Sequence, residues 1–217
     1  MNVLIVYAHH EPTSFTSAMK NLATQVLSAQ GHSVAISDLY GQGFNPVAQK
    51  WDFVTTSGKH FNYMFEQKHA ARLDMAFSPD IVGEIQKIQA ADLIIFATPI
   101  WWGGRSSLMQ RVIERLDALD EEYISSGRSA LLNKVAGIVI TGSEDGAQAT
   151  LGSIMEVLTF MNFTLPPECA TYWIGEVGQP GKENREKRLK NESTNNMAQN
   201  MARNLVYYAK LLSLYPL

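Results

Sequence analysis

A cluster of hydroxyl and imidazole side chains follows the first apolar run of the chain. The segment from position 9 to 17 includes His9, Thr13, Ser14, Thr16 and Ser17. The next residues have the apolar spacing of a helix, and a helix N-terminus presents free N–H groups and partial positive charge that can hold a phosphate. The pattern predicts a phosphate-binding loop, without the glycine fingerprint of nicotinamide-binding folds. The alternative is that Ser14 or Thr16 only caps the helix.

The stretch Thr98–Gly104, TPIWWGG, places two of the four tryptophans side by side at the end of a second apolar run. Neighbouring residues of an extended segment point to opposite sides, so we expect one ring to face a ligand pocket and the other to pack away from it. The two glycines that follow leave room for backbone to approach a ligand. The stretch therefore favours a platform for a flat ligand, and core packing is the alternative.

A third candidate loop, Thr141–Gly146, follows another apolar run. Gly142 and Gly146 permit tight turns, and free N–H groups there could stabilise negative charge on a bound ring. A plain strand-to-helix turn is the alternative. Taken together, the three loops predict a phosphate held at a helix start and an aromatic system flanked by tryptophan and glycine backbone, which fits a flavin nucleotide. The protein would bind and orient the ring while the flavin does the redox chemistry.

Five short apolar runs predict the strands that position these loops. Two of them, LIVYA and LIIFA, are continuously apolar, as in parallel strands buried on both faces. The predicted strands are Val3–Ala8, Val34–Leu39, Leu93–Ala97, Val135–Thr141 and Thr171–Ile174.

Segments with helical apolar spacing alternate with these runs. One starts with Pro79 at a helix N-terminus and carries Ile81, Ile85 and Ile88 on one face, and the last spans Asn195–Leu214. The alternation predicts an α/β fold: a flavodoxin-like, doubly wound, five-stranded parallel sheet of order 2-1-3-4-5 with helices on both faces. We expect a single domain over residues 1–217 with an irregular insertion at about 41–78. The insertion is too long for a plain connection, and long connections of this kind are usually functional or partner-binding.

Composition narrows the function classes. The 217 residues are 46% hydrophobic and 18% charged with a net charge of −3, so nucleic-acid binding is not expected. The single cysteine, Cys169, excludes an intramolecular disulfide and a cysteine-cluster metal site. The sequence contains no apolar run of transmembrane length and its start has no basic leader, so we expect a cytoplasmic protein with no membrane span.

The first half of the chain resembles the flavodoxin-like NAD(P)H:quinone oxidoreductases. The resemblance rests on AHHEPTSFTSAMK (8–20), SDLY (37–40), FNP (44–46) and the run from Phe77 to Phe96 followed by PIWWGG. The second half is similar to the FMN-containing quinone reductases and NADPH-dependent FMN reductases, through residues 133–167 and YWIGE (172–176). Both halves imply the same fold and a flavin-dependent oxidoreductase that uses NADH or NADPH.

The resemblance also implies positions for the cofactor. His9, Thr13, Ser14, Phe15, Thr16 and Ala18 would contact the flavin phosphate or pyrophosphate. Pro99, Ile100, Trp101, Trp102 and Gly103 would line the isoalloxazine ring, and Thr141, Gly142 and Ser143 its other edge. Asn62 falls where the family has an amide side chain near the cofactor. Family members are commonly homodimers with the active site near the interface.

This sequence departs from the mammalian quinone reductases in one loop. They have a Tyr and a His after the fourth strand that assist quinone reduction, whereas this chain reads GSEDGAQATLG there. That role therefore does not transfer, and we assign no catalytic side chain. The first half favours FAD and the second FMN, with FAD the slightly favoured cofactor.

The predicted reaction is a two-step exchange in one pocket. NAD(P)H gives hydride to the flavin and leaves, and a quinone or similar aromatic acceptor then enters and is reduced, which predicts ping-pong kinetics. Two rival functions keep the fold. One is a flavodoxin-type electron carrier, which the charge of −3 and the long insertion disfavour. The other is a catalytically weak regulatory subunit.

Overall fold

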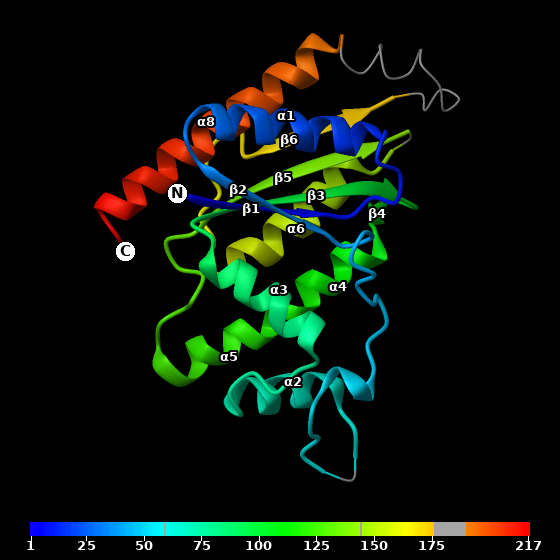
Figure 1. Cartoon of the computed structure of the whole chain (residues 1–217), viewed down its shortest axis with the longest axis vertical. Helices are drawn as coiled ribbons and strands as arrows, with labels where there is room; N and C mark the ends of the chain where they lie inside the picture. Colours follow the sequence, from blue (N-terminus) through cyan, green and yellow to red (C-terminus); the bar gives the residue numbers. More distant parts are fainter. Residues whose placement is uncertain (59, 144, 176–189) are drawn as a thin grey trace.

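A parallel sheet forms the centre of the molecule. The structure is a computed structural model that describes residues 1–58, 60–143, 145–175 and 190–217. The parallel strands lie in the order β2-β1-β3-β5-β6, which confirms the predicted fold class (Figure 1). Their bounds are β1 Asn2–Tyr7, β2 Ser33–Asp38, β3 Leu93–Trp101, β5 Val135–Gly142 and β6 Ala170–Ile174.

The sheet differs from the prediction by one short strand. β3 runs on to Trp101, turns through Trp102 and Gly103, and pairs antiparallel with β4, Gly104–Arg105. Trp102 has φ of 50° and Gly103 has φ of 73°, which is the backbone of a two-residue hairpin turn with positive φ at both positions. The stretch expected to be a loop after the third strand is therefore a hairpin.

Helices cover both faces of the sheet (Figure 1). α1 and α8 lie on one face, and α3, α4, α5 and α6 lie on the other. The bounds are α1 Phe15–Ala29, α3 Pro79–Ala90, α4 Ser107–Arg115, α5 Asp117–Ser126, α6 Ala147–Phe160 and α8 Glu192–Leu214.

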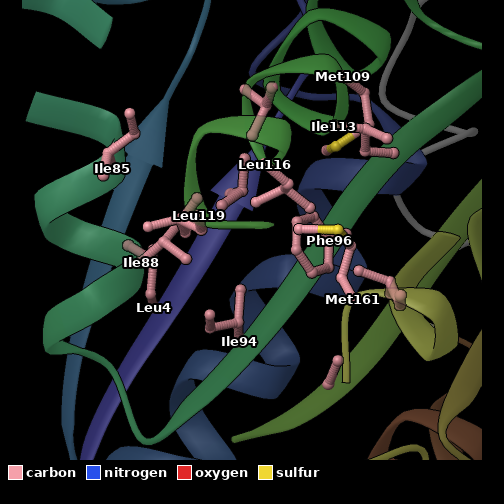
Figure 2. Close-up of a cluster of buried hydrophobic side chains, with 14 of the residues drawn as sticks. Leu4, Ile85, Ile88, Ile94, Phe96, Met109, Ile113, Leu116, Leu119 and Met161 are labelled. Carbon is pink, nitrogen blue, oxygen red and sulfur yellow. The ribbon is translucent and has the colours of Figure 1, made fainter. Parts of the chain in front are cut away.

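Alternation along the buried strands divides the core in two. Leu4, Ile94 and Phe96 face the side of α3 and α4, whereas Val3 and Ile95 face α1 and α8. Figure 2 shows the first of these clusters, in which side chains of α3 and α4 pack against β1 and β3. Burial on both faces accounts for the continuously apolar strand sequences.

The insertion contains a helix that its sequence did not predict. Residues 41–78 include the short 3-10 helix η1, Lys50–Asp52, and α2, Tyr63–Arg72, which packs on α5. The buried residues of α2 include Glu66 and Gln67, so its inner face is largely polar. Apolar periodicity detects only apolar faces, and for that reason the segment was expected to be irregular.

Candidate functional site

The first candidate loop ends at the start of α1. Ser14 is the N-cap, and its hydroxyl accepts a hydrogen bond from the N–H of Ser17 at 3.1 Å. Phe15 and Thr16 occupy the first two helical positions, whose N–H groups have no acceptor within a helix. Capping and phosphate binding are compatible here, because the cap engages one N–H group and the first two point out of the helix end.

Thr13 and Glu11 are joined within the same loop. The carboxylate of Glu11 accepts from the hydroxyl of Thr13 at 2.6 Å and from its N–H at 2.7 Å. These two hydrogen bonds, the hydroxyl first, hold the pKa of the Glu11 carboxyl below its usual value. Because the Thr13 hydroxyl donates to Glu11, it fixes the shape of the loop in this structure.

Two contacts join the start of α1 to strands β5 and β6. The hydroxyls of Thr16 and Thr141 lie 2.6 Å apart, both buried, although 125 residues separate them in the sequence. Beside them the Phe15 ring stacks on Trp173 of β6 with centroids 4.5 Å apart. The first predicted loop and the third, which begins at Thr141, are therefore in direct contact.

Tyr7 and Lys20 lie beneath the start of α1 and were not assigned roles from the sequence. The Lys20 ammonium lies 4.7 Å from the centre of the Tyr7 ring. Burial raises the pKa of Tyr7, while hydrogen bonds from the side chains of Ser14 and Ser17 act in the opposite direction. Burial also lowers the pKa of Lys20. The signal that could have found Lys20 is its position one turn after Ser17, on the same face of α1.

The second candidate stretch is the hairpin formed by β3 and β4. Pro99 pairs with Thr141 in the sheet register, and Ile100 is buried against the third loop. Trp101 is 38% exposed, and Trp102 at the tip is 106% exposed. We expected one of the two tryptophan rings to pack against the protein on the side away from the pocket, and that expectation is wrong. The positive φ of Trp102 turns its ring out of the strand and into solvent, away from the core.

Glycines at the third loop are explained by the hairpin. A Cβ on Gly142 would lie 3.0 Å from Cβ of Ile100, and a Cβ on Gly146 would lie 2.9 Å from Cα of Gly103. Thr150 of α6 also donates to the Gly103 carbonyl at 3.2 Å. The two glycines were expected to let the backbone approach a ligand, but in this structure they let it approach the hairpin. Ser143, between them in the sequence, is exposed.

Four rings gather where β1, β2 and β3 end, and we call them the imidazole–tryptophan cluster: His9, His10, Tyr40 and Trp101. The two imidazoles stack with centroids 4.9 Å apart, and the His10 ring lies 5.6 Å from Trp101 and 5.9 Å from Tyr40. Strand order reverses between β1 and β3, which is where ligands bind in sheets of this kind. His10 and Tyr40 were not predicted as site residues, yet each lies within two residues of the end of a strand that the sequence did predict.

Asn62 and Ala18 are the remaining predicted positions. Asn62 is the N-cap of α2, and its side chain accepts from the N–H of Phe65 at 3.2 Å. The structure therefore places Asn62 on the insertion, in a capping role. Ala18 lies half-buried in the first turn of α1.

The arrangement fits a flavin phosphate and ring by its donor set. The α1 start offers N–H groups with Lys20 behind them, and the cluster offers an accessible aromatic surface at Trp101. Among the described residues, no group of His, Cys, Asp and Glu has a metal-binding arrangement. The described helices also include none with the length and hydropathy needed to cross a bilayer.

Comparisons with known proteins agree with the fold. Residues 1–191 match the model of a protein family described as having a flavodoxin-like fold. A ribosyldihydronicotinamide dehydrogenase (quinone) of Pongo abelii is 40% identical over 146 residues, which cover 62% of this chain and 63% of that protein. An NAD(P)H dehydrogenase (quinone) 1 of Rattus norvegicus is 40% identical over 156 residues, covering 70% and 57%. The chain thus spans less than two thirds of the length of these relatives.

A solved structure gives the same fold at low sequence identity. It is RosB with bound 8-demethyl-8-formylriboflavin-5'-phosphate, which superposes with a TM-score of 0.75 at 22% identity. The match covers 100% of this chain and 82% of that one.

Proposed function

This chain belongs to the family with the flavodoxin-like fold, and from that premise we propose that it is a flavin-dependent NAD(P)H oxidoreductase that reduces quinones or similar aromatic acceptors by two electrons. Relatives named as quinone dehydrogenases of NAD(P)H or of ribosyldihydronicotinamide support this activity. FAD is the cofactor we expect, with FMN as the alternative, and the cytoplasm is the proposed location.

One observation carries the proposal. The Thr16–Thr141 contact joins the helix start suited to a phosphate to the loop beside the hairpin, which supports a single site built from the three loops. A phosphate alone would need only the start of α1, and an aromatic ring alone would need only the cluster. Their combination at the switch point supports a ligand that has both parts.

The protein's own groups would bind and orient such a ligand. The N–H groups of Phe15 and Thr16 would hold the phosphate with the hydroxyls of Ser14 and Ser17 nearby. Trp101 would contact the ring, and Thr141, Gly142 and Ser143 would lie along its edge. A bound flavin supplies the chemistry of accepting hydride from NAD(P)H and passing electrons to an acceptor.

An absorption spectrum of the purified protein, followed by mass analysis of the released cofactor, tests this proposal first. We expect flavin bands and FAD, and a mass for FMN would select the alternative. NADH and NADPH oxidation is then measured with a quinone, where parallel double-reciprocal lines support the ping-pong scheme. Absence of flavin bands after reconstitution, or of NAD(P)H oxidation by the loaded protein, would contradict the proposal and favour a regulatory subunit or an electron carrier respectively.

We also propose a homodimer assembled through the insertion. Among the described residues between 47 and 73, seven large apolar side chains are more than 40% exposed: Val47, Trp51, Val54, Phe61, Met64, Phe65 and Leu73. Such a concentration marks an interaction surface. Analytical ultracentrifugation of the wild type and of a Trp51→Ser, Phe65→Ser double variant should show a dimer and a monomer. A monomeric wild type at micromolar concentration would refute the assembly.

A further inference from the structure

A cavity of about 420 Å³ opens beside the imidazole–tryptophan cluster. Its size falls within the range of small-molecule sites. The cavity lies between the segment after β2 and the start of α4, and its lining residues are Leu39, Tyr40, Gly43, Phe44, Asn45, Pro46, Ser107 and Leu108.

The floor of this cavity is apolar and its mouth is polar. Leu39, Phe44 and Leu108 are buried, whereas Asn45 and Ser107 are exposed. The floor is held in place because the N–H of Phe44 donates to the carbonyl of Leu39 at 3.0 Å, closing a tight turn. Such a floor favours an apolar group that enters from the solvent side.

The side chains that line the cavity carry no charge. All eight residues around the cavity are uncharged, and burial raises the pKa of Tyr40, so its phenol stays neutral at physiological pH. The lining side chains therefore offer a phosphate or carboxylate no ion-pair partner. An uncharged alkyl or aryl group suits the cavity better.

Tyr40 connects the cavity to the candidate site. It lines the cavity and also packs edge-on against His10, whose ring lies 5.6 Å from Trp101. A molecule whose ring lies at Trp101 could therefore extend past His10 into the cavity.

We propose that this cavity binds the apolar substituent of a substituted quinone while the quinone ring occupies the site at Trp101. The inference rests on the proposed quinone reduction and adds a substrate class, quinones with an uncharged hydrocarbon tail. Burial of about two methylene groups is enough for a tenfold gain in affinity, so a longer tail gives a measurable preference.

The test compares two quinones that differ only in the tail: 2,3-dimethoxy-5-methyl-1,4-benzoquinone and its 6-decyl derivative. Their binding to the flavin-loaded protein is measured by calorimetry, and turnover is measured with NAD(P)H. The wild type should bind the decyl compound at least tenfold more tightly than the tail-free one. Ser107→Phe, which places a ring over the cavity mouth, should reduce this preference to less than twofold.

The matched control is Ser28→Phe, the same substitution at an exposed position in the last turn of α1, which should keep the wild-type preference. If Ser107→Phe does not fold, Asn45→Trp fills the mouth from the opposite wall. Retention of the full tail preference in the filled variant would overturn the inference. Tail-dependent binding without any NAD(P)H oxidation would instead overturn the proposed function and leave the tail site in place.

Discussion

The loops at the carboxyl edge of the sheet and the insertion of residues 41–78 lie outside the regular core, yet different forces hold them. The edge loops depend on a buried hydroxyl pair, close glycine contacts and a helix cap. The insertion depends on buried charge: Asp52 accepts from Arg111 and Arg115 of α4, and the Tyr63 ring lies within 5 Å of both guanidinium groups.

The two regions therefore differ in the kind of contact that holds them, neutral in the edge loops and ionic in the insertion. The Ser14 cap acts within three residues of itself, whereas the Thr16–Thr141 pair and the Asp52–arginine contacts join residues far apart in the sequence. The insertion is fixed only when α4 is in place, because both arginines come from that helix. Four substitutions test this contrast.

Removal of the buried carboxylate should have the largest effect. Asp52→Asn removes the carboxylate that Arg111 and Arg115 share. The two arginines are 1% and 2% exposed, so solvent cannot replace it. Breaking a buried ion pair from one side costs about 3–5 kcal/mol of unfolding free energy, as measured by urea denaturation. Asp74→Asn, at an exposed aspartate of the same insertion, should change it by less than about 0.5 kcal/mol. Equal effects of the two variants would remove the contrast between the regions.

At the edge loops, Gly146→Ala should cost less but act directly on the site. Gly146 has φ of 108°, and its added Cβ would lie 2.9 Å from Cα of Gly103 in the hairpin turn. The strained φ alone costs about 1–3 kcal/mol, and we expect weaker flavin binding because the hairpin must move. Gly152→Ala in α6 has open space around it and should stabilise the protein slightly. Unchanged flavin affinity in Gly146→Ala would show that hairpin and ligand are independent.

Thr16→Val tests the hydroxyl pair that joins two of the loops. Valine keeps the shape of threonine but leaves the buried Thr141 hydroxyl without its partner, which costs about 1–2 kcal/mol. Thr16→Ser keeps the hydroxyl and should recover most of the loss in unfolding free energy and in flavin affinity, measured by fluorescence quenching. Should serine and valine behave alike, the contact contributes only packing.

The sequence predicts most of the fold because strand apolarity and helix spacing are local patterns. Two strand segments are continuously apolar because helices cover both of their faces, namely Val3–Ala8 and Leu93–Ala97. This pattern can be recognised in the sequence alone. The helix α2 was missed because its buried face holds Glu66 and Gln67, whose partners lie elsewhere in the chain. For the same reason nothing local marked Asp52 as a buried anion.

The candidate site divides in the same way. Ser14 as a cap and the strand-end glycines could be read from their neighbours. The outward turn of Trp102 could not, because it depends on β4 pairing back onto β3. His10 and Tyr40 meet only because β1 and β2 lie side by side.

The smallest effect on the unfolding free energy should come from acidification, through the exposed carboxylate of Glu11 in the first loop. The pKa of Glu11 is lowered by Thr13, so its contribution is fully present above the unfolded value of about 4.5 and is lost as pH falls through the folded pKa. The unfolding free energy of the wild type should exceed that of Glu11→Gln at pH 7, and the gap should close by pH 3. Glu156→Gln, at an exposed position of α6, is the control and should show no such gap. Because Glu11 is exposed, added salt should narrow the gap at pH 7, whereas the Asp52→Asn effect should persist in salt. A Glu11→Gln gap that is constant from pH 7 to pH 3 would mean that the carboxylate charge does not stabilise this loop.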